Sequence, residues 1–148
     1  MGKIPVSVKD LGVDLLTIAS QKMYGPKAIG VLYKRTGVTL TRFMDGAHHE
    51  GHQRAGTENV PYIVGLGKAA ELVQSNLVSY ADNMKTMRDA LYTGLQDLVP
   101  GLRFVQLAQR ILINRLNGHE TLRLPNTLNV SLPDVDVHKL AALLKDEV

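Results

Sequence analysis

Residues 13–33 have the sequence VDLLTIASQKMYGPKAIGVLY, and this stretch decides the fold class. Its first part, residues 13–19, is a short apolar run rich in strand-forming residues, which predicts a buried strand of the kind found in parallel sheets. Gly25-Pro26 is a turn signal, and residues 29–34 predict a second strand. Two strands joined through a turn that carries Lys22 indicate the last part of an α/β sheet.

The longest regular pattern lies in residues 59–98. Apolar or small residues recur there at spacings of three and four, which is the period of a single helical stripe: Ile63, Leu66, Ala70, Val73, Leu77, Tyr80, Met84, Met87, Leu91, Leu95 and Leu98. Asn59 is a plausible N-cap and Pro61 suits the first turn, while Pro100-Gly101 ends the run. A straight helix of this length would span about 60 Å, so we expect a kink or break near Ser75-Asn76.

Shorter patterns flank this helix. They predict, in chain order, a weakly alternating stretch at 38–43, a polar loop at 44–58, a strand at 102–108, a loop at 114–126, a strand at 127–132 and an amphipathic helix at 136–147. The class is therefore α/β, with three parts: the strands and loop of residues 1–58, the linking helix of residues 59–98, and a small α+β part in residues 99–148. A buried parallel strand needs helices on both faces, which residues 1–58 do not supply, so we expect this part to belong to something larger.

Composition excludes several functions. The 148 residues contain no cysteine, which rules out disulfides, Cys-ligated zinc, iron–sulfur clusters and a thiol nucleophile on this chain. The net charge of +3 is mild and scattered, which disfavours nucleic-acid binding. No apolar stretch is long enough to cross a membrane, and the first residues lack the apolar core of a signal peptide. We expect a cytoplasmic protein, with the mitochondrial matrix as the alternative.

Lys22 is the first candidate for chemistry. It follows a buried strand at the start of a Gly/Pro turn, where desolvation favours the neutral amine that condenses with an aldehyde. Ser20 and Gln21 beside it can hydrogen-bond an anion. The alternative is an ordinary surface lysine in a loop.

Two further segments precede the long helix. Arg54, Thr57 and Asn59 place polar groups at a helix N-terminus, which is a potential anion site; the alternative is helix capping by Thr57 or Asn59. His48, His49 and His52 resemble metal ligands, but the pattern His-Glu-Gly-His is not the zincin motif. We therefore expect no metal site, and a solvated loop or the rim of an active site instead.

Three segments together resemble cysteine desulfurases and selenocysteine lyases, which are class V aminotransferase-like enzymes of pyridoxal-phosphate (PLP) fold type I. Residues 13–33 resemble the lysine segment, whose pattern is S-x-H-K-x-Y-G-P-K-G-x-G-x-L-Y. Residues 46–67 resemble the G-G-G-Q-E…R-x-G-T-E-N-x-P segment, and residues 124–129, LPNTLN, resemble the R-L-P-N-T-x-N strand. The matches occur in family order with family-like spacing and span most of the chain.

The resemblance implies a role for each site residue. Lys22 would bind pyridoxal 5'-phosphate covalently and move the proton on the substrate's α-carbon. Ser20 and Gln21 would contact the cofactor, and Thr57 would reach the phosphate of the partner subunit across a homodimer. The family's histidine before the lysine is Gln21 here, the family's serine is Ala19, and the glycine-rich segment has Ala47 and His48 in place of glycines.

The resemblance also implies the architecture and the activity. We expect the C-terminal part of a PLP fold type I large domain plus a small α+β domain, incomplete at both ends, with the cofactor-lysine loop in residues 1–58. The whole enzyme would release sulfur or selenium from cysteine or selenocysteine, leave alanine, and pass the atom to an acceptor protein. The chain alone is expected to be inactive. The alternative is a truncated homologue that serves as a dimerisation or regulatory module.

Overall fold

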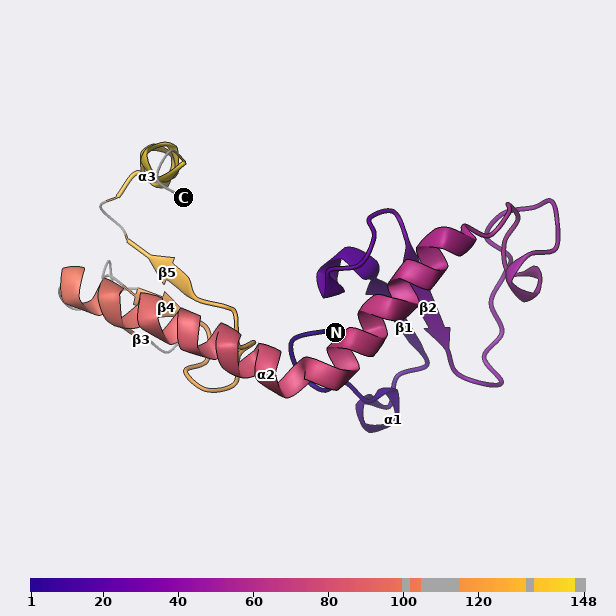
Figure 1. Cartoon of the computed structure of the whole chain (residues 1–148), viewed down its shortest axis with the longest axis horizontal. Coiled ribbons are helices and arrows are strands. Elements are labelled where there is room, and N and C mark those ends of the chain that lie inside the picture. Colours follow the sequence, from indigo (N-terminus) through magenta and orange to yellow (C-terminus); the bar gives the residue numbers. More distant parts are fainter. Residues whose placement is uncertain (100–101, 105–114, 133–134, 146–148) are drawn as a thin grey trace. The chain divides into compact units, whose positions relative to one another are not determined.

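The computed structural model describes residues 1–99, 102–104, 115–132 and 135–145 (Figure 1). The chain forms two compact units, Met1–Tyr80 and Ala81–Val148. The long helix α2, Val60–Leu98, contributes residues to both. The three-part division of the chain expected from the sequence stays a prediction.

The first unit is built on an antiparallel pair of strands, β1 (Leu15–Ala19) and β2 (Gly30–Lys34). Thr17 is paired with Leu32, and Ala19 with Gly30. Both predicted strands are confirmed, but the expected parallel, fully buried surroundings are wrong for this pair. The connection from residue 20 to residue 29 is too short for the crossover that parallel strands require, and Leu15 remains 42% exposed.

Three short helical turns lie in the same unit. The first, α1 (Val8–Leu11), is capped by Ser7, whose side chain accepts from the Asp10 N–H, and ends at Gly12 in the left-handed region. Between β1 and β2 lies the 3-10 turn η1 (Ser20–Met23). The third, η2 (Glu50–His52), lies in the polar loop predicted at 44–58.

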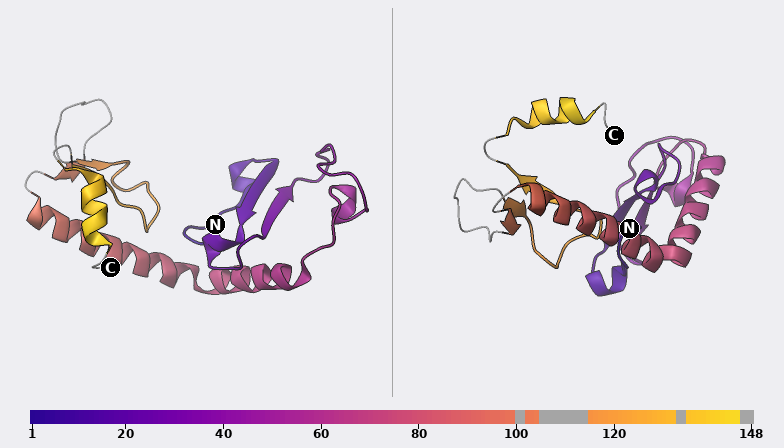
Figure 2. Two further views of the ribbon diagram at one scale, coloured as in Figure 1. Left: turned by 90° about the horizontal axis from the view of Figure 1, so that it is seen from above. Right: turned by 60° about the vertical axis from the view of Figure 1, so that its left-hand side comes forward.

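Helix α2 confirms the helical stripe. Asn59 caps it, because its Oδ1 accepts from the Tyr62 N–H at 3.3 Å. The helix is continuous through Ser75-Asn76, so a break there is wrong, and the alternative of a kink stays a prediction. Asn76 Nδ2 donates to the Leu72 carbonyl at 2.9 Å. In the first unit, the first half of α2 passes in front of the β1–β2 ribbon in Figure 1 and along one side of it in Figure 2.

Few side chains of the first unit are buried, and of these only Ser20 is completely buried. These residues are Ser20, Met23, Ala55, Ala69 and Val73. Two of them belong to η1 and two to the first half of α2. The end of the Lys22 turn lies against this half of the helix, because a Cβ on Gly25 would be 3.1 Å from Ala69 Cβ.

The second unit contains a three-stranded sheet, β3 (Arg103–Phe104), β4 (Arg115–Asn117) and β5 (Asn129–Ser131), in which β3–β4 is parallel and β4–β5 antiparallel. Helix α3 (Val137–Leu144) follows, capped by Asp136, which accepts from two backbone N–H groups.

The predictions for this part of the chain have mixed outcomes. The strand at 127–132 and the helix at 136–147 are confirmed, and β3 confirms the start of the strand at 102–108. A continuous loop at 114–126 is wrong, because β4 lies in it. The signals at Pro100-Gly101 and Pro133-Asp134, and the end of the 102–108 strand, fall outside the described residues.

Candidate functional site

Lys22 lies in η1, and backbone hydrogen bonds fix this turn to the ribbon. The Ser20 N–H donates to the Ile29 carbonyl at 3.2 Å, which ties the start of η1 to the strand β2 that follows. The Ser20 carbonyl accepts from the Tyr24 N–H and from the Gly25 N–H, the latter at 3.1 Å. The turn is thus closed at both ends around Lys22, whose side chain is exposed.

A cavity of about 460 Å³ opens beside this turn. Its walls come from the end of β1, from η1 and from the residues leading into β2: Met1, Thr17, Ile18, Ala19, Gln21, Lys22, Ala28, Ile29 and Gly30. Lys22 and Gln21 thus contribute an amine and an amide to a wall that is otherwise largely apolar. This combination suits a ligand that has both an apolar surface and a polar or anionic group.

Ser20 points elsewhere. It is completely buried and is not among the residues that line the cavity. Its Oγ lies so close to Gly25 that a Cβ on that glycine would collide with it, and this oxygen has no hydrogen-bond partner in the described part of the chain. The structure therefore brings Gln21 and Lys22 together at the cavity and turns the Ser20 side chain toward Gly25.

Ala28 is a cavity residue that the sequence analysis missed. It lines the wall and has φ of 62°, in the left-handed region that favours glycine. The family pattern quoted above has glycine at this position, and that comparison could have identified it. Tyr24, on the other side of Gly25-Pro26, also has a left-handed φ, of 63°, and its hydroxyl accepts from Lys3 Nζ at 2.7 Å.

Thr57 and Arg54 lie in the segment that leads into α2. Thr57 is exposed and does not line the cavity. Arg54 forms a bridge pair with His49, and its Nε donates to the Ala55 carbonyl at 3.0 Å. The helix-capping alternative is confirmed for Asn59, whereas the role of Thr57 stays a prediction.

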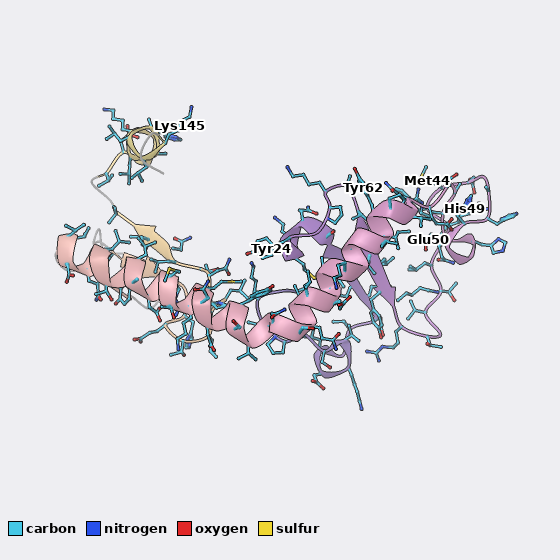
Figure 3. All side chains as sticks on the ribbon, in the orientation of Figure 1. Tyr24, Met44, His49, Glu50, Tyr62 and Lys145 are labelled. Carbon is cyan, nitrogen blue, oxygen red and sulfur yellow. The ribbon has the colours of Figure 1, made fainter. Side chains whose placement is uncertain are left out.

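The histidine loop is ordered by internal hydrogen bonds. His48 Nδ1 and His52 Nδ1 are 2.8 Å apart, so one nitrogen donates to the other. Arg42 donates to the carbonyls of Met44, Gly46 and Ala47. Figure 3 shows His49 and Glu50 on this loop and Tyr62 in the first turns of α2. Among the described residues, no three His, Cys, Asp or Glu side chains are grouped so that they could hold a metal ion.

The length and hydropathy of the helices bear on membrane insertion. Within the described ranges, none is both long and apolar enough to cross a bilayer.

Solved structures share this fold. A NifS-like protein is 34% identical and superposes with a TM-score of 0.84, over 99% of this chain and 36% of that one. A NifS-like protein from Rickettsia africae is 26% identical, with a TM-score of 0.83 over 97% of this chain and 36% of that one. The chain thus has the fold of part of a larger NifS-like protein.

Sequence relatives agree with the structures. Cysteine desulfurase 2 of Trichormus variabilis is 39% identical over 92% of this chain and 31% of its own length. Cysteine desulfurase IscS of Methanosarcina thermophila is 38% identical over 97% of this chain and 32% of its own length. The chain therefore spans about a third of the length of these relatives. The family model for class V aminotransferases matches residues 1–147, and the chain belongs to that family.

Proposed function

We propose that this chain supplies the cofactor-lysine part of a PLP-dependent cysteine desulfurase. The observation that carries the proposal is the position of Lys22, on a hydrogen-bonded turn at the wall of a cavity, with Gln21 beside it. The relatives named cysteine desulfurase support it, because they match nearly the whole chain. The activity belongs to the complete enzyme, of which the chain corresponds to about a third.

The residues at the cavity fit pyridoxal phosphate. The Lys22 amine can condense with its aldehyde, the Gln21 amide can donate to its phosphate, and Ile18 and Ile29 offer apolar surface to its ring. When bound, the cofactor supplies an electron-accepting ring that stabilises negative charge on the substrate's α-carbon. Lys22 would then remove and return the proton at that carbon.

Thr57 and Ser20, the other two expected cofactor residues, do not line the cavity. Thr57 would contact the phosphate bound by the partner subunit of a homodimer, which its exposure permits. Ser20 would contact the cofactor only if its Oγ turned away from Gly25. We propose cysteine as the amino-acid substrate and a sulfur-accepting protein as the partner; selenocysteine is the alternative substrate.

The test compares two lysines of one loop. Lys22 and Lys27 are both exposed, but only Lys22 lines the cavity. The chain is incubated with pyridoxal phosphate, the bound cofactor is fixed with borohydride, and the labelled lysine is identified by peptide mass spectrometry. We expect the label on Lys22, its loss in Lys22→Ala, and its retention in Lys27→Ala. Equal labelling of the two lysines in the wild-type chain would refute the proposal. The assay requires no turnover, so it needs neither the amino-acid substrate nor the sulfur acceptor.

A further inference from the structure

We propose that Gly65 of α2 is a positioning residue for Lys22, and that it acts by seating Gly25-Pro26 against the helix. The proposal rests on the function proposed for Lys22 and adds a site on α2 that neither lines the cavity nor carries a reactive group.

The first step is a close approach of the loop to the helix. A Cβ placed on Gly65 would lie 2.7 Å from Pro26 Cγ and 3.2 Å from Pro26 Cδ. One turn further along α2, Ala69 is buried, and a Cβ on Gly25 would lie 3.1 Å from its Cβ. The first half of α2 therefore presents a surface of small residues into which Gly25-Pro26 fits, with no room for a methyl group at position 65.

The second step is the connection from this contact to Lys22. Pro26 follows Gly25, whose N–H donates to the Ser20 carbonyl and so closes the turn that contains Lys22. The Ser20 side chain fills the space beside Gly25 and is completely buried. A displacement of Pro26 would therefore move Gly25 and strain the hydrogen bond that closes the Lys22 turn.

The third step explains why position 65 of α2 is a glycine. Glycine inside a helix is unfavourable relative to alanine. Gly67 and Gly94 lie in the same helix, and a Cβ on either would meet nothing within 4 Å. Gly65 differs from both through its contact with Pro26. This difference also makes Gly67→Ala a matched control, since it has the same propensity gain without the contact.

The experiment measures the loop directly. Wild type, Gly65→Ala and Gly67→Ala are compared by amide hydrogen exchange without cofactor. We expect exchange of the Gly25 N–H to be about tenfold faster in Gly65→Ala, the lower end of what an overpacked contact costs, and unchanged in Gly67→Ala. Equal Gly25 exchange in the two variants would overturn the inference.

A second readout reports on Lys22 itself. The rate of borohydride-trapped labelling by pyridoxal phosphate is measured at Lys22 and divided by the rate at Lys85, an exposed lysine of the second unit. This ratio should fall about tenfold in Gly65→Ala and stay constant in Gly67→Ala; a constant ratio in both overturns the positioning role. If wild-type Lys22 reacts no faster than Lys85, the proposed function fails, while the Gly25 exchange still decides the contact.

A rescue variant covers the case in which Gly65→Ala does not fold. Pro26→Ala removes the ring atoms that the new methyl group would meet. The double variant Gly65→Ala/Pro26→Ala should therefore match Pro26→Ala alone in Gly25 exchange and in the labelling ratio. If the double variant is as impaired as Gly65→Ala, the contact with Pro26 is not the cause and the proposal is wrong.

Discussion

At the scale of single residues, the sequence placed Lys22 on its turn but did not predict where the neighbouring Ser20 side chain points. Lys22 could be placed because a strand followed by a Gly/Pro turn is a local signal. The direction of the Ser20 side chain could not, because it depends on Gly25 and on the helix packed above it, which comes much later in the chain. The left-handed backbone of Ala28, with φ of 62°, was missed although the glycine of the family pattern at this position is a signal for it.

Ala28 carries a residue-scale prediction. A left-handed conformation costs a non-glycine residue about 1–2 kcal/mol, and glycine gives back part of that through its larger entropy loss on folding. We expect Ala28→Gly to raise the free energy of unfolding by about 0.5–1 kcal/mol. Urea unfolding monitored by circular dichroism measures it.

The matched control is Ala70→Gly, at an exposed position inside α2. It should destabilise the chain by about 1 kcal/mol, because the backbone there is helical. A loss of stability in both variants would mean that position 28 is not strained.

At the scale of elements, the spacing of apolar residues predicted the long elements well and the short ones poorly. The stripe of residues 59–98 gave α2 to within one residue at its start, because its apolar repeat persists over many turns. By contrast, β4 covers only Arg115–Asn117, too few residues to show alternation, and it exists through pairing with β3 and β5. The antiparallel pairing of β1 was missed because a buried apolar run does not specify which partner lies beside it.

The start of α2 carries an element-scale prediction that separates its two candidate caps. Asn59 directly precedes the helix and its Oδ1 accepts from the Tyr62 N–H, whereas Thr57 lies two residues further from the helix. We expect Asn59→Ala to lower the free energy of unfolding by about 1 kcal/mol and to lower the helical signal before the main transition. Thr57→Ala should leave both unchanged. Thermal scans by circular dichroism test this, and the reverse ranking would assign the cap to Thr57.

At the scale of the whole molecule, the exposed apolar surface follows from the share of the fold present. The chain corresponds to about a third of its relatives, and in the described residues β1 pairs with β2 alone. Leu32 is 52% exposed and Phe43 is 85% exposed. This exposure could not be predicted from the sequence. An apolar run shows that a strand is suited to a core, but it does not show whether other parts of the chain cover that strand.

This exposed ribbon predicts self-association of the chain. A strand with an unpaired edge and apolar neighbours is a template for another strand, and a lysine on the edge opposes such pairing. We expect the sedimentation coefficient of the wild-type chain to rise with concentration, and Thr17→Lys, at an exposed position of β1, to suppress the rise. Thr36→Lys makes the same change of charge in the turn after β2 and should leave the rise in place. Equal suppression by both variants would show that net charge, rather than the edge of β1, controls the association.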